Sequence, residues 1–362
     1  MKLKKLSEHL HHIQDLIIET RIPSDPYIKK ICNDSRKIED SCLFVAIKGT
    51  NSDGHQFISQ AISAGATSII YENDFGFQND NVQFIRVSDA RAAYSRLCEF
   101  FFDNPSQKLK LIGITGTNGK TTSAFLTKAI LQSCSLKSGL ISTVCVDNGK
   151  EIFESQRTTP DAFELQKIFY EMTQNLCSHA VMEVSSHSLD QNRIGTAEFA
   201  GVIFTNLSGD HLDYHKSFDD YQKVKKSLFD ANPRVPKVVN IDDELGAEIA
   251  FSNKEVITYG IKKKADVAAS GLKLSADSTQ FNLHLKGQTI PIKLKLKGKF
   301  NVYNSLAAAG AAMALGCSLE EIKQGLEEVE NVPGRMEFID QAQDFFVVVD
   351  YAHTPDGLEK VL

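Results

Sequence analysis

The sequence has 362 residues, with 40 Lys and Arg against 46 Asp and Glu and a formal net charge of −6. This balance excludes a general attraction to nucleic acid or to anionic membranes, so any affinity for phosphate has to be local. No apolar run approaches the roughly 20 residues of a membrane-spanning helix. The seven cysteines form no Cys-x-x-Cys pair, which favours reduced thiols in a cytoplasmic protein over disulfides or a zinc site.

Residues 1–107 are predicted to form a small α/β domain, which ends at the turn-forming Asn-Pro-Ser of residues 104–106. Its clearest elements are a strand, a helix and a second strand, over Cys42–Ile47, Phe57–Ala64 and Thr67–Tyr71. Two turn-rich loops, Asn33–Arg36 and Gly49–Gly54, carry polar residues but no evident catalytic group. These loops either bind a ligand or merely connect strands.

The most informative segment, residues 113–124, reads Gly-Ile-Thr-Gly-Thr-Asn-Gly-Lys-Thr-Thr-Ser-Ala. A short buried strand is predicted before it and a helix after it. Gly116 and Gly119 lack a Cβ, which lets backbone N–H groups approach a polyphosphate at the positive end of the helix. Lys120 adds a full charge, and the Thr121 hydroxyl is a suitable ligand for Mg²⁺. This strand, loop and helix predict a nucleotide-phosphate site.

From residue 108 to about 333, apolar strands alternate with helical stretches, as in a mainly parallel sheet with helices on both faces. The predicted strands after the phosphate loop are Gly139–Val144, Ala180–Val184, Gly201–Thr205 and Lys237–Ile241. The predicted helices are Thr121–Gln132, Phe163–Gln174, Phe218–Phe229 and Asn304–Leu315. Residues 265–296 are more strand-like and are predicted to pair antiparallel. The fold class is therefore α/β, with a central sheet of the phosphate-loop type.

A third region, residues 334–362, is predicted to be the start of a Rossmann-like domain. Two strands, Arg335–Ile339 and Phe345–Asp350, precede a helix that begins near Thr354. Two strands and part of a helix cannot bury a core of domain size. We therefore expect the sequence to be cut short inside this domain.

Polar residues follow two of the predicted strands at their carboxyl ends, where sheets of this type bind ligands. Glu183 ends one strand and can hold Mg²⁺ directly or through water, with a strand-end ion pair as the alternative. The next strand is followed by a dense group of oxygen and imidazole ligands, Asp210, His211, Asp213 and His215. Their place beside the phosphate loop favours a ligand role for His211, whereas ligand and structural roles are equally open for His215.

Two further polar groups each have two explanations on the residues alone. Lys223, Lys225 and Lys226 lie close enough to lower one another's pKa, and a neutral amine can add CO₂ to give a carbamate, an oxygen ligand for Mg²⁺. Three lysines on a solvated helix face is the more common outcome. Thr158 and Thr159, just before a predicted helix, suit an anionic ligand or a helix cap equally well.

Together these motifs resemble those of the Mur ligases, and within that family the UDP-N-acetylmuramoyl-tripeptide synthetases. The matching segments are Asp34–Arg36, Gly116–Thr122, Thr158–Pro160, Glu183–His187, Asp210–His215, Phe300–Asn304 and Asp350–Asp356. They occur in family order from about residue 30 to the end. The phosphate-loop segment is shared with folylpolyglutamate synthases, whereas Thr-Thr-Pro, His-Leu-Asp-Tyr-His and Asp-Tyr-Ala-His-Thr-Pro-Asp single out the synthetases.

The resemblance implies an ATP-dependent amide ligase of peptidoglycan synthesis in the cytoplasm, and hence a role in cell shape and cell division. The D-glutamate carboxylate of UDP-MurNAc-L-Ala-D-Glu would attack the γ-phosphate of ATP to give an acyl phosphate. The amine of a diamino acid, meso-diaminopimelate or L-lysine, would then displace phosphate. Mg²⁺ is the implied cofactor. A monomer that binds no nucleic acid and does not insert into membranes is expected.

Family positions carry over to this sequence residue by residue. The implied catalytic residues are Lys120, Glu183, His211 and Lys225. The implied ATP-binding residues are Gly116, Thr117, Asn118, Gly119, Lys120, Thr121, Thr122, Asn304, Arg335 and Asp350. The implied Mg²⁺ ligands are Thr121, Glu183, His211 and Lys225, the last as a carbamate. The implied contacts to the UDP-linked substrate are Asn33, Ser35, Thr50, Asn51, Ser52, Thr158, Thr159, Ser185, Gln191 and Arg193.

The resemblance also divides the chain and leaves alternatives. Residues 1–107 would bind UDP, residues 108–333 would form the ATP-binding ligase domain, and residues 334–362 would begin the C-terminal Mur ligase domain. The family's Asp-Asn-Pro-Arg motif for diaminopimelate has no match here, so the acceptor amino acid is not readable. The alternatives are another Mur-type ligase, a folylpolyglutamate synthase, or an inactive fragment that binds nucleotide and UDP-sugar.

Overall fold

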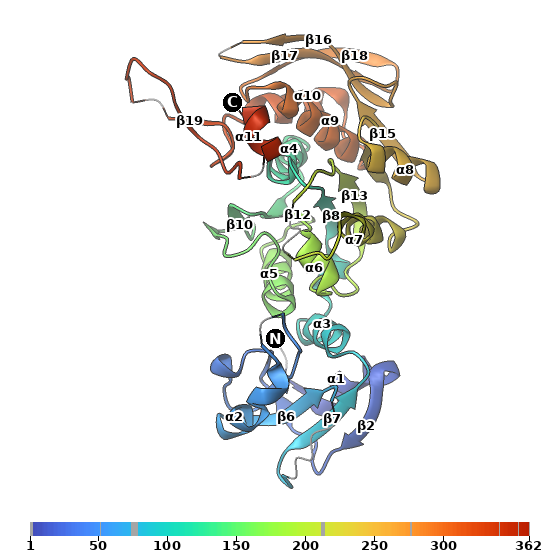
Figure 1. The fold of residues 1–362 in the computed structure, drawn as a ribbon, viewed down its shortest axis with the longest axis vertical. Helices are drawn as coiled ribbons and strands as arrows, with labels where there is room; N and C mark the ends of the chain where they lie inside the picture. The colour runs from blue at the N-terminus through green and yellow to red at the C-terminus, as the bar shows by residue number, and fades with distance from the viewer. Residues whose placement is uncertain are drawn as a thin grey trace. The chain divides into compact units, whose positions relative to one another are not determined.

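The computed structural model describes residues 3–50, 52–73, 79–210, 214–275, 277–339, 341–353 and 355–361. The chain forms two compact units, whose elements are labelled in Figure 1. Unit 1 comprises Met1–Lys108, Pro160–Tyr170 and Gln191–Ala197, and unit 2 comprises Leu109–Thr159, Glu171–Asp190 and Glu198–Leu362. Among the helices of the described ranges, none combines the length and apolar character that spanning a bilayer requires.

Unit 1 contains a five-stranded sheet within the described residues, in the order β2-β7-β6-β5-β4. These strands are Ile17–Arg21, Gln83–Val87, Ala66–Tyr71, Cys42–Val45 and Lys30–Cys32, and all are parallel except β2. Side chains alternate between the two faces of a strand, so Leu43 and Val45 pack with α3 (Ala90–Phe101) while Phe44 packs with α2 (Ile58–Ser63). The predicted α/β fold of this region is confirmed.

The remaining elements of unit 1 are short. Helix α1 (Leu6–His11) lies between β1 (Lys4–Lys5) and β3 (Tyr27–Ile28), which pair antiparallel. Single-turn helices η1 to η4 cover Gln14–Leu16, Ser35–Lys37, Gly54–Phe57 and Pro105–Lys108. Two of these turns, η2 and η3, follow the carboxyl ends of β4 and β5, so the polar loops of the sequence lie at one edge of the sheet.

Unit 2 is built on a large sheet, in the order β11-β10-β9-β12-β8-β13-β14-β15-β16-β17-β18. Its parallel centre consists of β9, β12, β8, β13, β14 and β15, which are Ser138–Ile141, His179–Glu183, Lys110–Thr115, Phe199–Phe204, Lys237–Asn240 and Val256–Gly260. Antiparallel pairs extend both sides, with β10 (Cys145–Asp147) and β11 (Ile152–Glu154) at one edge. At the other edge are β16 (Val267–Leu274), β17 (Thr279–Leu285) and β18 (Gln288–Leu294). The predicted parallel centre and antiparallel segment are both confirmed.

Helices cover both faces of this sheet. One face is covered by α4 (Lys120–Ser133), α9 (Lys299–Ala314) and α10 (Leu319–Glu328), and β16–β18 pass over α9 and α10 (Figure 1). On the other face are α7 (Phe218–Asp230) and α8 (Glu244–Ser252), because Phe204 of β13 meets Phe229 of α7 at a ring distance of 6.1 Å and also contacts Gly246 of α8. The single-turn α6 (Ser186–Asp190) also belongs to unit 2, whereas α5 (Ala162–Gln174) belongs to unit 1 as far as Tyr170 and to unit 2 from Glu171.

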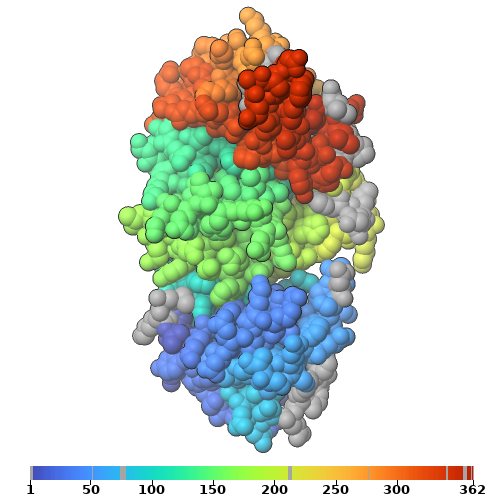
Figure 2. Space-filling view, turned by 90° about the vertical axis from the view of Figure 1, so that its left-hand side faces the viewer, coloured from blue at the N-terminus to red at the C-terminus, as the bar shows by residue number. Residues whose placement is uncertain are grey.

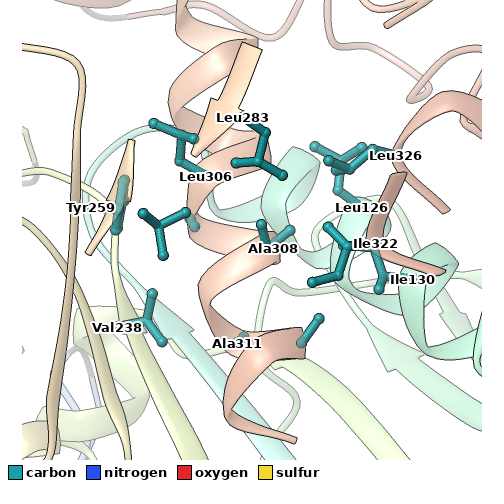
Figure 3. Packing of buried hydrophobic residues seen from close by; sticks show 14 of the residues in the cluster. Leu126, Ile130, Val238, Tyr259, Leu283, Leu306, Ala308, Ala311, Ile322 and Leu326 are labelled. Atoms are coloured by element: carbon teal, nitrogen blue, oxygen red, sulfur yellow. The ribbon is translucent and has the colours of Figure 1, made fainter. Parts of the chain in front are cut away.

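Small residues let the helices of the first face approach closely. Figure 3 shows Ala308 and Ala311 of α9 between the sheet residue Val238 and the side chains of α4 and α10. A Cβ on Gly310 would lie 2.7 Å from Val238 Cγ1, and one on Gly325 of α10 would lie 2.4 Å from the Cα of Ile130 in α4. This tight packing fixes α4, and therefore the loop before it, against the sheet.

Two predicted boundaries were wrong. The strand predicted to run to Val144 ends at Ile141, because the Ser142 hydroxyl accepts N–H groups of Val144 and Cys145 and turns the chain into β10. Helix α9 begins at Lys299 rather than Asn304, since Gly298 at φ +98° provides its start.

The last residues form β19 (Glu337–Ile339), β20 (Val347–Val349) and α11 (Pro355–Val361), the two strands and helix that were predicted. The strands pair antiparallel. The expected capping residue, Thr354, lies outside the described residues. In the space-filling view this red segment lies against the green and teal part of the same unit (Figure 2).

Candidate active site

A cavity of about 720 Å³ lies at the carboxyl ends of β12, β8, β13 and β14, which are neighbours in the sheet. The loop after β8, Glu183 at the end of β12 and the segment after β13 form one wall. Residues of α9 and of the C-terminal segment form the opposite wall. The position agrees with the rule that open parallel sheets bind ligands at these strand ends.

The loop after β8 has a backbone that only glycine allows at two places. Gly116 has φ +144° and Gly119 has φ +84°, both in the region that side chains disfavour. A Cβ would lie 1.9 Å from Thr205 Oγ1 at Gly116 and 2.4 Å from Asn304 Oδ1 at Gly119. The loop therefore passes so close to its neighbours that a side chain at either glycine would collide with Thr205 or Asn304.

Backbone contacts fix this loop on the strand beside it. Thr117 donates its N–H to the carbonyl of Asn206 at 2.8 Å, and Asn118 donates its N–H to Asn206 Oδ1 at 3.0 Å. The Thr117 hydroxyl also lies 3.1 Å from the hydroxyl of Tyr221 in α7. Thr117 to Thr122 all line the cavity, so the predicted phosphate-loop residues form a continuous surface.

Two lysines donate to a single carbonyl of the loop. Lys120 Nζ lies 2.9 Å and Lys225 Nζ 2.8 Å from the Gly116 oxygen, and Lys120 also reaches the carbonyl of Thr117 at 2.8 Å. Lys225 is 1% exposed. Burial and the charge of Lys120 hold the pKa of Lys225 well below its usual range, and burial also lowers the pKa of Lys120. The arrangement increases the fraction of neutral amine at Lys225.

Of the three clustered lysines, only Lys225 is buried. Lys223 is exposed, and Lys226 forms an ion pair with Glu248 on the outside of α7. Helical spacing explains this difference, because one residue of the cluster faces the sheet while its neighbours face solvent.

Glu183 is fully buried at the end of β12 and faces the cavity. Its Oε1 accepts the N–H of Thr143 at 2.7 Å and its Oε2 accepts the Thr143 hydroxyl at 3.2 Å. The Thr143 hydroxyl is also 3.1 Å from the hydroxyl of Thr158. Asp210, after β13, lines the same cavity. The Glu183 carboxylate is therefore held by neutral donors, and a buried carboxylate with such partners is suited to binding a cation.

Hydroxyl groups lie beside this carboxylate. The Thr159 hydroxyl donates to the Glu183 carbonyl at 2.8 Å and accepts the N–H of Ser185 at 3.1 Å. Its oxygen also lies 3.3 Å from the Ser185 hydroxyl. Thr158, Thr159 and Ser185, three of the predicted substrate contacts, thus lie together next to Glu183.

The far end of the cavity is formed by α9. Asn304 is held by its amide group, which donates to Asn301 Oδ1 at 3.0 Å, and its side chain faces Gly119. Phe300 and Tyr303 line the cavity from the same helix, and Lys262 lines it from the segment after β15. These side chains offer aromatic faces and an amide group to a ligand in the cavity.

The C-terminal segment contributes a cation. Arg335 donates from Nη2 to the Thr121 hydroxyl at 3.1 Å and lies over the Tyr351 ring, 5.0 Å from its centre. Asp350 accepts the N–H of Met336 and that of Ala352, each at 2.7 Å. Both predicted residues of this segment therefore line the cavity, Arg335 against the phosphate loop itself.

The other predicted substrate contacts lie in unit 1. Asn33, Thr50 and Ser52 are exposed in loops at the edge of the five-stranded sheet, and Ser35 donates to Gln60 Oε1 at 3.2 Å. Arg193 donates from Nε and Nη2 to Gln191 Oε1 at 3.0 and 2.7 Å. Asn51 lies outside the described residues.

His211 and Asp213, two members of the predicted ligand group, also lie outside the described residues. His215 is buried, and its Nε2 lies 3.0 Å from the Ser186 hydroxyl. It does not line the cavity. The structure therefore places Asp210 at the cavity and His215 in the packing behind it.

The donors present fit Mg²⁺ bound together with a polyphosphate. The part of the chain that the structure describes contains no cluster of three or more His, Cys, Asp and Glu side chains that could hold a metal alone. Thr121, Glu183 and Asp210 nevertheless face the same cavity as the phosphate loop. Mg²⁺ commonly uses one or two protein oxygens together with phosphate oxygens and water, and these three side chains can supply the protein oxygens.

Sequence reasoning missed several residues of this site. Thr143 holds Glu183, Tyr221 contacts Thr117, and Asp242 holds the Tyr303 hydroxyl at 2.9 Å. Asp242 could have been found by the rule that found Glu183, since it follows the carboxyl end of a central strand. Thr143 and Tyr221 gave no signal, because their role depends on contacts between distant segments.

Comparison with known proteins gives a consistent result. The model of the Mur ligase middle domain matches residues 114–312, and that of the Mur ligase family catalytic domain matches residues 27–102. The chain is 43% identical over 368 residues to UDP-N-acetylmuramoyl-L-alanyl-D-glutamate--2,6-diaminopimelate ligase 1 of Clostridium acetobutylicum, covering 100% of this chain and 74% of that protein.

Solved structures agree with the sequence matches. A structure of UDP-N-acetylmuramoyl-L-alanyl-D-glutamate--2,6-diaminopimelate ligase superposes with a TM-score of 0.80 at 28% identity, over 99% of this chain and 73% of that one. A MurF ligase from Thermotoga maritima in complex with ADP has a TM-score of 0.66 at 18% identity, over 91% of this chain and 73% of that one. The second likeness concerns the fold alone.

Proposed function

Because this chain belongs to the Mur ligase family and is an ATP-dependent amide ligase, we propose that it joins 2,6-diaminopimelate to UDP-N-acetylmuramoyl-L-alanyl-D-glutamate. The name of the relative from Clostridium acetobutylicum supports this substrate. The observation that carries the proposal is that the partly buried Lys120 and the buried Lys225 both donate to one carbonyl of the phosphate loop. A purely structural loop would not require two desolvated cations beside a buried carboxylate.

The proposed reaction couples two anions. The D-glutamate carboxylate attacks the γ-phosphate of ATP, ADP leaves, and the resulting acyl phosphate reacts with the amine of the diamino acid to release phosphate. Gly116 to Thr122 would form the triphosphate site, with the N–H groups at the start of α4 facing the phosphates. The N–H groups of Thr117 and Asn118 donate to Asn206 and hold the loop in shape. Lys120 would exchange its loop carbonyls for phosphate oxygens, and Arg335 would add a second positive charge. Stabilising charge that develops in this way is commonly the largest contribution to phosphoryl transfer.

Positioning gives the second contribution. Thr158, Thr159 and Ser185 lie beside Glu183 at the sheet edge and would hold the peptide part of the substrate near the phosphate loop. Holding two reactants in line can supply roughly 7–11 kcal/mol of barrier lowering. Asn304 would contact the adenine at the far end of the cavity.

Mg²⁺ is the proposed cofactor, and it would neutralise charge on the phosphates. Thr121 and Glu183 would hold the first ion. His211 and a carbamate on Lys225 would hold the second, and the lowered pKa of Lys225 favours the neutral amine that adds CO₂. Arg335 donates to the Thr121 hydroxyl, so its guanidinium would move when an ion binds to that hydroxyl.

The same proposal assigns a role to each region of the chain. Residues 1–107 would bind the UDP part through Asn33, Ser35 and Thr50–Ser52, with Gln191 and Arg193 completing the substrate contacts. Residues 108–333 would form the ligase domain, in keeping with the match to the Mur ligase middle domain. Residues 334–362 would begin the C-terminal domain. We further propose a cytoplasmic monomer, since the substrate is a nucleotide-linked precursor and the thiols are free.

Substrate dependence of ADP release tests the proposal. The chain is incubated with ATP, Mg²⁺ and either meso-diaminopimelate or L-lysine, with and without UDP-MurNAc-L-Ala-D-Glu, and the products are identified by mass. We expect ADP release only with the dipeptide substrate and an amide product with diaminopimelate. ATP hydrolysis that ignores the dipeptide, or turnover with the tripeptide product or a folate instead, would contradict it. Tight binding of both ATP and UDP-MurNAc-L-Ala-D-Glu without any release of ADP would indicate a protein that binds these ligands but does not catalyse the reaction.

A further inference from the structure

Two adjacent carboxylates follow the end of β14 and belong to no role assigned so far. Asp242 and Asp243 do not line the cavity, yet both contact residues that do or that lie next to it. Asp242 accepts three N–H groups from the segment after β15, whereas Asp243 accepts one from the segment after β13 and two from the start of α8. Asp242 contacts residues at one end of the cavity, and Asp243 contacts the segment at the other end.

Asp242 holds the wall at the far end. Its Oδ2 accepts the N–H groups of Ile261 and Lys262 at 2.7 and 2.8 Å and the hydroxyl of Tyr303 at 2.9 Å, while its Oδ1 accepts the N–H of Lys263 at 2.8 Å. Lys262 and Tyr303 line the cavity. Burial alone would raise the pKa of Asp242, but these donors together lower it below the usual range. Asp242 therefore stays an anion that gathers four donors.

The chain leaves room for this carboxylate. A Cβ on Gly260, at the end of β15, would lie 3.1 Å from Asp242 Cγ, which is closer than nearly all real contacts of that kind. A side chain at this position would require Asp242 to shift by a few tenths of an ångström. Three consecutive N–H groups of the segment 261–263 thus converge on the Asp242 side chain.

Asp243 holds the other end. Its Oδ1 accepts the N–H groups of Leu245 and Gly246 at 3.0 and 3.2 Å and so caps α8. Its Oδ2 accepts the N–H of Leu207 at 2.9 Å. Leu207 directly follows Asn206, which binds the phosphate loop, and lies three residues before Asp210. Asp243 therefore connects the start of α8 to the segment that carries Asp210.

One turn anchors both contacts to the sheet. Asn240 donates from Nδ2 to the carbonyl of Thr205 at 2.9 Å, and its Oδ1 accepts the N–H of Asp242 at 3.1 Å. A Cβ on Gly246 would lie 1.9 Å from the Asn240 carbonyl, so α8 is seated directly on this turn. The turn after β14 is consequently a rigid junction between the far wall and the phosphate side of the cavity.

We propose that Asp242 and Asp243 are positioning residues with separate tasks, Asp242 for binding of the nucleotide base and Asp243 for the phosphoryl-transfer geometry. The inference rests on the proposed function, because it takes ATP to occupy this cavity with its phosphates on the loop after β8. Asp242 acts through Lys262 and Tyr303, and Asp243 acts through Leu207 and the segment leading to Asp210. Neighbours in sequence thus control different steps.

Amide substitutions separate the two tasks. In Asp242→Asn one of two acceptor atoms becomes an NH₂ group, so at least one of the four donors meets another donor. In Asp243→Asn the remaining oxygen can keep the cap of α8, while the NH₂ group faces the N–H of Leu207. An unpaired or opposed buried N–H group is unfavourable by an amount that shifts equilibria about tenfold or more. Each variant therefore loosens one wall and leaves the other in place.

The test combines steady-state kinetics with direct binding of ATP to the full chain, measured by calorimetry. We expect Asp242→Asn to raise the KM and Kd for ATP roughly tenfold with kcat within about twofold. Asp243→Asn is expected to lower kcat roughly tenfold with the Kd for ATP little changed. Tyr303→Phe should reproduce part of the Asp242→Asn effect, and the double variant should be less than additive because the two groups share one hydrogen bond.

Asp266→Asn is the matched control, since Asp266 accepts the N–H and hydroxyl of Thr258 at 2.9 and 2.6 Å and does not line the cavity. It should leave KM and kcat unchanged. The inference would be overturned if Asp242→Asn and Asp243→Asn changed the same kinetic parameter equally, or if they changed only thermal stability.

Hydrogen exchange separates this inference from the proposed function. Faster exchange of the peptide containing Leu207 in Asp243→Asn but not in Asp242→Asn supports the inference even if the wild-type chain makes no amide with UDP-MurNAc-L-Ala-D-Glu. Failure of the wild-type chain to make this amide would, by itself, refute only the substrate assignment. Equal exchange in both variants would refute the separate tasks.

Discussion

In both units, parallel strands end in polar loops at one edge of the sheet. Charged side chains at this edge are buried in unit 2, whereas in unit 1 they pair within their own turns. In unit 2, Glu183 and Lys225 are at most 1% exposed and meet the phosphate loop or its neighbours. In unit 1, Asp34 binds the side chain and N–H of Arg36 within its own turn, and Asp53 does the same with His55. The edge of unit 1 offers exposed hydroxyl and amide groups instead.

The difference shows what each edge can do. Burial lowers the pKa of Lys225, and buried charged groups interact strongly with their neighbours, which favours chemistry on charged groups. Exposed neutral groups bind a ligand with modest energy and no strong field. Under the proposed function, the reaction takes place at the edge of unit 2 (the reacting edge), and the edge of unit 1 binds the UDP part of the substrate. Variants at the two edges should therefore impair different steps.

The largest effect is expected at Lys225. Lys225→Ala removes the buried amine from the phosphate loop and, under the proposed function, the carbamate ligand, so we expect turnover to fall about 10³-fold or more. Binding of the UDP-linked substrate should be retained. Acetate or formate added to the assay is expected to restore part of the activity. The measurement is the initial rate of ADP release.

Lys226→Ala is the control for this variant, because Lys226 is its neighbour but pairs with Glu248 on the outside of α7. It should keep nearly full activity. Full activity of Lys225→Ala would show that buried charge at this edge is structural, and the contrast between the two units would then lose its functional meaning.

The next effect concerns the glycine loop. Gly119→Ala combines a disfavoured φ of +84° with a Cβ 2.4 Å from Asn304 Oδ1, so we expect the affinity for ATP to fall roughly 10- to 100-fold. Gly287→Ala has a similar φ of +76° but no atom within 4 Å of its Cβ, and it measures backbone strain alone. Calorimetric titration with ATP compares them. Equal affinities in the two variants would contradict a tight approach of the loop to Asn304.

The sequence predicted the parts of this molecule that depend on local pattern. The phosphate loop, the parallel centre and the antiparallel segment follow from glycine positions and apolar periodicity, and the structure has each of them. Placing Glu183 at the cavity needed only the rule for strand ends. Local periodicity could not separate Lys225 from Lys223, because which side of α7 faces the loop depends on packing across the sheet.

Long-range contacts account for what was missed. Thr143 meets Glu183 across 40 residues and Tyr221 meets Thr117 across 104, and no local pattern marks either hydroxyl. The Ser142 turn was missed because a serine in an apolar run reads as part of the strand. Such residues are found only once the sheet order is known.

A smaller effect is expected at the edge of unit 1. Thr50→Val removes one exposed hydroxyl from a loop closed by the hydrogen bond from the Gly49 N–H to the Ser52 carbonyl at 2.8 Å. We expect the KM for UDP-MurNAc-L-Ala-D-Glu to rise about 3- to 10-fold with kcat unchanged. Ser59→Ala, an exposed hydroxyl on α2 of the same unit, serves as the control. A fall in kcat would place this loop in the chemistry and blur the distinction between the units.

The smallest effect is a pH-dependent gain in stability. Burial and Lys120 depress the pKa of Lys225 in the folded state, so the unfolded chain binds a proton more tightly there. The lysine is therefore destabilising at low pH, and this penalty fades as pH rises through the folded pKa toward the ordinary lysine value of about 10.4. Lys225→Met in CO₂-depleted buffer should unfold less readily near neutrality, by a free energy on the order of 1 kcal/mol, with the advantage shrinking toward alkaline pH.

Lys226→Met gives the opposite sign, because the ion pair with Glu248 raises the pKa of Lys226. Its contribution is present below the ordinary lysine pKa and is lost only as pH rises through the raised value, so its removal should give a small, constant loss between pH 6 and pH 9. Urea unfolding over that range measures both variants. Parallel pH profiles for the two would mean that Lys225 is not desolvated in solution, and the reacting edge of unit 2 would then hold its charges no differently from the surface of α7.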